Sequence, residues 1–191
     1  MIASALAFIL QTIFGLFTLV LLLRFYLQLT RAPFQNPVSQ AVVAVTNFIV
    51  KPVRRIIPGY RGIDLTTLLL AYLSQFILLL LLRWLGDFPF LVAGSGIWIS
   101  LFGLALVEIL KLSIYIFLYA VIAQAILSWI NPYNQLTPLL DALTRPILAP
   151  LRRLIPTAGG FDFSPIIVFI VAQLLIMLVI TPLEVQFLRM V

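Results

Sequence analysis

Four long apolar stretches, separated by shorter polar segments, organise this chain. They cover residues 1–23, 65–82, 107–130 and 163–183. A helix needs about 20 mostly apolar residues to cross a hydrocarbon core of about 30 Å. The pattern therefore predicts an all-α integral membrane protein with four transmembrane helices.

Residues 88–106 form a further uncharged stretch just before the third predicted span. A single helix over residues 88–130 would be about 60 Å long, which is too long for a simple crossing. The stretch also contains Pro89, Gly94, Gly96 and Gly103. We therefore expect residues 88–106 to be a broken hairpin or an interfacial segment.

The composition agrees with a membrane protein and excludes several kinds of chemistry. The chain is 63% hydrophobic and 9% charged, whereas soluble domains have about 45–50% and about 25%. It contains no cysteine and no histidine, which excludes disulfides, thiolate catalysis and most zinc sites. Gly94-Ser95-Gly96 is too short for a phosphate loop. We expect no enzyme activity, no metal and no cofactor.

The positive charges predict an orientation in the membrane. Eight of the 12 basic residues lie in two connections, residues 30–63 and 131–162. An excess of Lys and Arg marks the cytoplasmic side, so both connections are expected inside and both termini on the periplasmic side. Basic residues beside apolar spans also favour anionic phospholipid head groups over nucleic acid as the partner.

The two basic connections resemble each other in sequence. A shift of 98 residues aligns Thr46 with Thr144, and the prolines, paired arginines and aspartates that follow also match. This predicts two tandem, parallel helix–loop–helix repeats, each with a cytoplasmic interfacial or re-entrant segment. We divide the chain into a first repeat at 1–85, an apolar connector at 86–106 and a second repeat at 107–191.

The shared motif is P-x-R-R-[IL]-I-P-x3-G-x-D, and each part has a physical interpretation. Proline suits the first position of a short helix, which is expected for Pro52 and Pro150, and Pro58 and Pro156 would end that helix. A sharp turn is expected at the glycines, which are Gly62 and Gly160. The motif ends at Asp64 and Asp162, which would cap the next helix or neutralise the arginines.

Asn36-Pro37, the run PVRRIIP at residues 52–58 and its second copy PLRRLIP at residues 150–156 resemble the YggT family of bacterial inner-membrane proteins. That family has relatives in cyanobacteria and plastids. The resemblance implies a small multi-spanning protein without established enzymatic activity. It also implies loose links to cell division, osmotic stress tolerance and the assembly of membrane complexes or cofactors. It assigns no catalytic residue.

The paired arginines are the main binding candidates. Topology needs only positive charge, whereas the planar guanidinium binds phosphate or carboxylate bidentately. If the repeats pack side by side, the four arginines would form one basic patch for anionic lipid or for another membrane protein. These candidates are Arg54, Arg55, Arg152 and Arg153.

Polar residues within the predicted spans are the second group of candidates. Gln75 and Gln173 lie about 16 Å beyond the aspartates, near mid-membrane, where they would hydrogen-bond across the repeat axis or line a path. Glu108 and Lys111 are one helical turn apart and are expected to pair. Gln124 is a further intramembrane polar residue, and Arg24 is expected to extend to the inner surface.

These features favour a non-catalytic inner-membrane protein that acts in membrane-protein assembly, scaffolding or stress tolerance through its two arginine loops. The alternative is a small ion channel or transporter linked to osmotic stress. The sequence shows few charges at mid-membrane and no recognisable selectivity filter, which favours the first interpretation.

Overall fold

In a computed structural model, the chain is described at all residues except 58, 60–61, 91–93, 132, 155–161 and 191. All regular elements in these described residues are helices. They are α1 (Ile2–Leu29), α2 (Pro37–Arg54), α3 (Leu65–Leu85), α4 (Gly96–Ile130), α5 (Thr137–Leu154), α6 (Ser164–Leu175), the π-helical segment η1 (Ile176–Ile180) and α7 (Thr181–Leu188).

Four helical rods are long and apolar enough to cross a membrane. These are α1, α3, α4 and the continuous rod Ser164–Leu188, with 28, 21, 35 and 25 residues. Large apolar side chains on their outer faces are exposed, including Phe8 and Met177 at 69% each, as expected where lipid is the solvent. The predictions of an all-α fold and of four helices long and apolar enough to cross a membrane are therefore confirmed.

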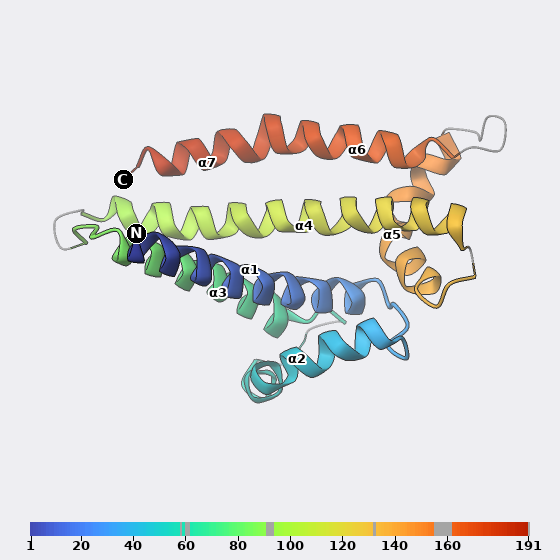
Figure 1. Cartoon of the computed structure of the whole chain (residues 1–191), viewed down its shortest axis with the longest axis horizontal. Coiled ribbons are helices and arrows are strands. Elements are labelled where there is room, and N and C mark those ends of the chain that lie inside the picture. The colour runs from blue at the N-terminus through green and yellow to red at the C-terminus, as the bar shows by residue number, and fades with distance from the viewer. Residues whose placement is uncertain (58, 60–61, 91–93, 132, 155–161, 191) are drawn as a thin grey trace.

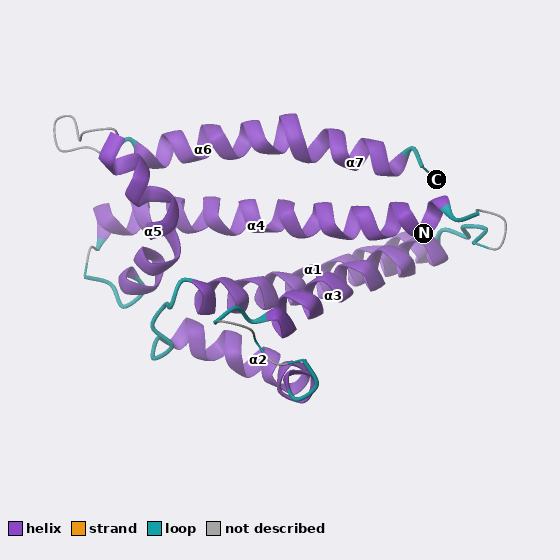
Figure 2. Cartoon of the chain, turned by 180° about the vertical axis from the view of Figure 1, so that it is seen from behind, coloured by secondary structure: helices purple, strands orange, loops and turns teal. Residues whose placement is uncertain are grey.

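Helix α4 lies at the centre of the bundle. It contacts the α1–α3 pair on one side and the α6–α7 rod on the other. Both termini and the α3–α4 connection lie at one end of the bundle, whereas α2, α5 and the loops that lead into them lie toward the other end (Figures 1 and 2). The two basic connections are thus on the same side of the bundle, as expected from their charge.

The sequence predicts a broken hairpin or an interfacial segment at residues 88–106, but residues 96–106 form the first part of a long helix. Helix α4 begins at Gly96 and continues without a break for 35 residues, about 52 Å. Gly103 lies against the ring of Phe187, and a Cβ atom at residue 103 would collide with that ring. This glycine therefore permits close approach of α4 and α7 and does not end a helix.

The expected short proline-bounded helices are also corrected. Pro52 lies inside α2, and Pro146 and Pro150 lie inside α5, so none of them starts a new helix. An internal proline removes one backbone hydrogen bond and bends the helix. In Figure 1 the last turns of α2 are seen nearly end-on, at an angle to its first turns.

Some of the glycine, proline and basic residues of the two loops lie outside the described residues. Gly62 has the positive φ of +87° that the expected sharp turn requires. The other predicted turn and helix-ending residues, and one counted basic residue, lie outside the described residues: these are Pro58, Arg61, Pro156 and Gly160.

Asparagines at aligned positions precede both loop helices and make the same local hydrogen bond. Asn36 Oδ1 accepts a hydrogen bond from the Val38 backbone N–H at 2.9 Å, and Asn134 Oδ1 accepts one from the Leu136 N–H at 2.9 Å. Asn36 Nδ2 also donates to the Gln135 carbonyl at 2.7 Å. This last bond joins the loops of the two halves.

Candidate functional site

An ion pair closes the loop between α2 and α3. Arg54 Nη2 donates to Asp64 Oδ2, and it also donates to Gln28 Oε1 of α1 at 3.4 Å. Asp64 accepts from the Thr67 backbone N–H at 3.3 Å and from the Thr67 hydroxyl. The Asp64 side chain is 1% exposed. It is therefore both the cap of α3 and the counter-charge of Arg54.

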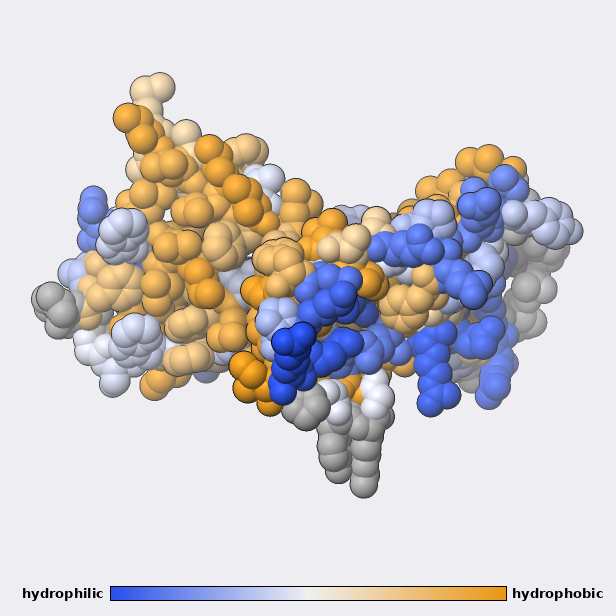
Figure 3. Space-filling view, turned by 90° about the horizontal axis from the view of Figure 1, so that it is seen from below, coloured by the Kyte–Doolittle hydropathy of each residue, from blue (hydrophilic) through white to orange (hydrophobic). Residues whose placement is uncertain are grey.

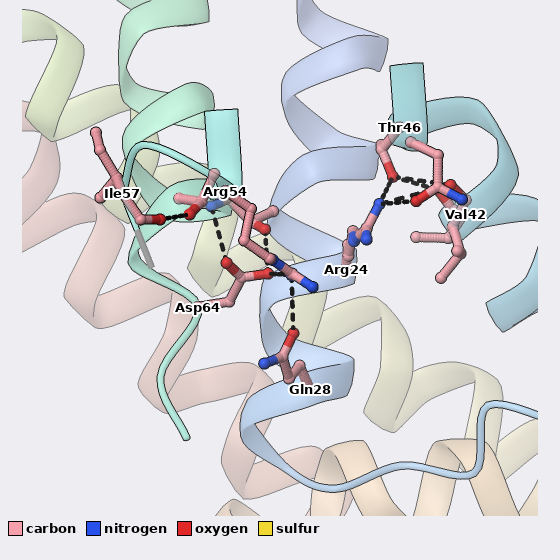
Figure 4. A network of polar contacts seen from close by, with 11 residues as sticks. Arg24, Gln28, Val42, Thr46, Arg54, Ile57 and Asp64 are labelled. Atoms are coloured by element: carbon pink, nitrogen blue, oxygen red, sulfur yellow. Dashed lines mark hydrogen bonds and ion pairs between the residues drawn. The ribbon is translucent and has the colours of Figure 1, made fainter. Parts of the chain in front are cut away.

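Arg24 on α1 belongs to the same region and is buried. Its Nη1 donates to Thr46 Oγ1 at 2.6 Å, Asn47 Oδ1 at 3.1 Å and the Val43 carbonyl at 3.5 Å, all on α2 (Figure 4). No carboxylate among the described residues forms an ion pair with it. The expectation that Arg24 reaches the surface is wrong, because α2 covers it and supplies neutral acceptors.

A second ion pair lies at the matching place in the second half. Arg152 Nε donates to Asp162 Oδ2 at 2.8 Å, and Asp162 Oδ1 accepts from the Ser164 backbone N–H at 2.9 Å. Partial burial opposes ionisation of Asp162, but hydrogen bonds with Ser164 and Arg152 and the charge of Arg152 outweigh it. Together they hold the pKa of the Asp162 carboxyl below its ordinary value.

Threonines at aligned positions tie each loop helix to its preceding span. Thr46 Oγ1 donates to the Val42 carbonyl at 2.7 Å and accepts from Arg24. Thr144 Oγ1 lies 2.8 Å from the Leu140 carbonyl oxygen and 2.5 Å from Gln124 Oε1, and its single hydrogen can be donated to either acceptor. Gln124, the intramembrane polar residue singled out from the sequence, also donates to Asp141 Oδ1.

We call Arg54–Arg55 and Arg152–Arg153 the two arginine turns. In each turn the aspartate binds the first arginine, whereas Arg55 and Arg153 are exposed and form no ion pair within the described residues. The expected single patch of four arginines is not formed. Helices α2 and α5 each pack against α1, but their C-terminal ends, which carry the arginines, diverge (Figure 1).

Polar residues nonetheless gather over one part of the molecule. Figure 3 shows most of the hydrophilic side chains over the half toward which α2, α5 and their loops lie, whereas the other half is mainly hydrophobic on this face, apart from polar residues at its far end. All four arginines of the two turns are exposed, at or next to the C-terminal ends of α2 and α5. A membrane would therefore meet them at its surface.

A third charged cluster lies between the spans. Lys111 Nζ on α4 is 2.7 Å from Glu184 Oε1 on α7 and 3.5 Å from Glu108 Oε1. The three side chains are 20–30% exposed. The expected contact between Glu108 and Lys111 is present, but the nearer partner of Lys111 is Glu184, which the sequence indicated only as the end of a span.

The two aligned glutamines are not partners. Gln75 is buried, with 5% exposure, whereas Gln173 is exposed on α6. Their helices α3 and α6 do not contact each other. The expected hydrogen bond across a repeat axis is therefore absent, because α4 separates the two helices.

Sequence reasoning identified the arginine–aspartate pairs as alternatives but missed the role of Arg24. Its signal was a lone charge just after an uncharged stretch, followed one turn later by Gln28. The bond of Asp141 with Gln124 depends on how α5 folds back on α4. Neither contact follows from periodicity alone.

Comparison with known proteins places these residues in context. The family model described as CCB3/YggT matches two segments of the chain, residues 3–85 and residues 103–183. An uncharacterised protein of Pseudomonas aeruginosa is 41% identical over 182 residues, covering 93% of this chain and 89% of that protein. The uncharacterised protein YggT of Escherichia coli K12 is 38% identical over 165 residues, covering 86% and 83%.

A further relative is an uncharacterised protein of Vibrio alginolyticus, with 34% identity over 174 residues that cover 89% of this chain and 90% of the relative. No solved structure matches the chain. The sequence resemblance is thus confirmed across both halves of the chain, and these relatives are themselves described as uncharacterised.

Proposed function

The chain belongs to the CCB3/YggT family, and from that premise we propose that it is a non-catalytic membrane factor that assembles or scaffolds other membrane components. The two arginine turns are its binding elements. Anionic phospholipid head groups and acidic loops of membrane proteins are the partners that their chemistry suits. A role in stress tolerance or cell division would follow from the complexes it supports.

One observation carries this proposal. In each half an aspartate holds the first arginine, and the second arginine is exposed without an ion pair in the described residues. The aspartate thereby fixes the backbone of the turn while the neighbouring guanidinium stays free. A guanidinium held at a fixed place binds a phosphate or carboxylate with less loss of conformational entropy.

The arrangement also supports an origin by duplication. The element order span, loop helix, span occurs twice, and the arginine and aspartate of each ion pair are ten residues apart in both halves. We propose two parallel repeats, in the cytoplasmic membrane of a bacterium, with both arginine turns in the cytoplasm. Two turns would allow the protein to bind two partners, or one partner at two points.

The experiment distinguishes bidentate binding by the arginine side chains from a simple requirement for positive charge. In the double variant R55K/R153K, positive charge is kept but the planar fork is lost, so we expect normal insertion and a clear loss of copurified phosphatidylglycerol and protein partners. The matched control is R54K/R152K, in which lysine still pairs with aspartate and retention should stay near wild type. Equal retention by wild type and R55K/R153K would reduce these arginines to topology signals and reject the proposal.

The charged cluster favours a second candidate function, a small ion channel or transporter. Ionisable groups within a membrane often mark ion or proton paths, and Glu108, Lys111 and Glu184 place two carboxylates around one ammonium group. Ion flux into liposomes that contain only this protein tests it. Flux that E184Q abolishes would support the transporter, and absence of flux for sodium, potassium and protons would reject it.

A further inference from the structure

A polar cavity lies between the C-terminal part of α4 and α5. Its volume is about 220 Å³, and its polar lining consists of Gln124 and Ser128 from α4 and Thr137, Asp141 and Arg152 from α5. A carboxylate and a guanidinium thus line the same cavity. Its lining residues come from the last turns of α4 and from α5, and these segments lie at the end of the bundle opposite the two termini (Figure 1).

Several polar groups of this cavity have unused hydrogen-bonding capacity. Asp141 accepts from Gln124 through Oδ1, and Arg152 donates to Asp162 through Nε. Within the described residues, Asp141 Oδ2 and the Nη groups of Arg152 have no hydrogen-bond partner. Thr137 Oγ1 is buried and also lacks one. Buried polar groups are almost always satisfied in proteins, so the Thr137 hydroxyl calls for a partner, and the half-buried Asp141 and the exposed Arg152 beside it offer an acceptor and donors to the same ligand.

An apolar cavity shares one lining residue with the polar one. It has a volume of about 290 Å³ and lies between α1, α4 and α5, and Leu140 lines both cavities. On α4 its lining residues, Ile116 and Ala120, come two turns before Gln124 and Ser128. On α4 the apolar cavity therefore reaches about two turns deeper into the bundle than the polar one, and it extends back to Val38 and Leu136 at the loop end. Along α4 this is the order of acyl chain and head group in one leaflet of a bilayer.

We propose that these two cavities bind a glycerophospholipid whose head group carries a primary ammonium and a phosphodiester. Arg152 would hold the phosphodiester, Asp141 Oδ2 and the Thr137 hydroxyl would accept from the ammonium, and one acyl chain would occupy the apolar cavity. Charge complementarity selects this lipid. With a head group that lacks an ammonium, the negative charge of Asp141 would face the negative phosphodiester without a compensating positive charge.

The first half of the chain does not offer the same site. Val43 stands at the position aligned with Asp141, and its carbonyl accepts from the buried Arg24. The carboxylate that would bind an ammonium is therefore missing there. The proposed site also does not depend on Arg55 or Arg153, so it goes beyond the proposed function and can succeed or fail separately from it.

The test compares lipids that differ only in the head group. The purified protein would be placed in nanodiscs with equal amounts of phosphatidylethanolamine, phosphatidylcholine and phosphatidylglycerol of identical acyl chains, and retained lipid would be measured by native mass spectrometry. We expect phosphatidylethanolamine to be retained about tenfold over the others, the ratio that one charge-assisted hydrogen bond supplies. Methylation of the ammonium in phosphatidylcholine removes those bonds. Equal retention of the three lipids would overturn the proposal.

Two variants locate the binding. D141N keeps an acceptor for Gln124 but loses the charge, so the preference for phosphatidylethanolamine should fall about tenfold, whereas the matched change D87N at the opposite end should leave it intact. Should D141N fail to fold, T137V supplies the test, because its hydroxyl has no partner to lose. T137V should unfold at the wild-type temperature in lipid-free detergent and retain several-fold less phosphatidylethanolamine. Unchanged retention in a folded D141N or in T137V would overturn the proposal.

Discussion

At the scale of single residues, one carboxylate does two tasks in each half of the chain. Asp64 and Asp162 each accept a backbone N–H at the start of a transmembrane helix and bind an arginine ten residues earlier. From the sequence, these aspartates are expected either to cap the next helix or to neutralise the arginines. The geometry combines them, because the two oxygens of a carboxylate accept independently.

Asp162 gives a pH-dependent prediction. Its pKa is lowered in the folded protein, so its contribution to stability is complete above its ordinary pKa of about 3.9 and is lost as pH falls through the lower folded value. D162N should therefore unfold at a lower temperature than wild type at about pH 7, and the difference should shrink below about pH 4. Thermal unfolding in detergent measures this. In an R152Q background D162N should have a smaller effect, and an equal effect at every pH would contradict the ion pair.

The buried Arg24 gives a second prediction at this scale. T46V removes the 2.6 Å acceptor of a buried guanidinium, so it should destabilise the protein by about 1–3 kcal/mol. The matched control is T12V, since Thr12 bonds only to the Phe8 carbonyl of its own helix and is exposed, and its effect should stay within about 0.5 kcal/mol. Equal unfolding temperatures for T46V and T12V would show that α2 is not held through Arg24.

At the scale of elements, apolar length predicted the spans well, and local helix breakers predicted their ends poorly. The four rods follow from runs that only a membrane helix accommodates. Gly103 and the prolines of α2 and α5 misled the prediction, since a membrane helix keeps glycine where a neighbour packs closely and tolerates proline where a bend suits the packing. Which of these applies depends on partners such as Phe187, and sequence spacing does not reveal them.

The packing at Gly103 can be tested directly. G103A places a methyl group against the Phe187 ring, so it should destabilise the α4–α7 contact by about 1–3 kcal/mol. The control is G15A in α1, where no atom lies within 4 Å of the added Cβ, and the better helix propensity of alanine should leave stability equal or slightly higher. Thermal unfolding in detergent compares them. The double variant G103A/F187A should lose less than the two single changes together.

At the scale of the whole molecule, the distribution of positive charge and the arrangement of the helices both distinguish one end of the bundle from the other. Eight of the 12 basic residues belong to the two loop regions, and the helices of those regions lie toward one end of the bundle while both termini lie at the other. The candidate sites were less predictable than this polarity. Bonds such as those of Arg24 with α2 and of Gln124 with Asp141 require that each loop helix folds back onto a span, and that fold is set by three-dimensional packing.

This difference between the two ends of the bundle predicts the topology of the protein in cells. Lys and Arg in short loops keep those loops in the cytoplasm, so a reporter that is active only outside the cytoplasm should be silent when fused after Arg55 or after Arg153. The same reporter fused to the C-terminus should be active. The chain has four candidate spans, so its C-terminus lies on the same side as its N-terminus, opposite the two loops. Comparable expression of all fusions is the control. Activity after Arg153 with silence after Arg55 would mean that the two halves have opposite orientations, which would contradict both the bundle geometry and the idea of parallel repeats.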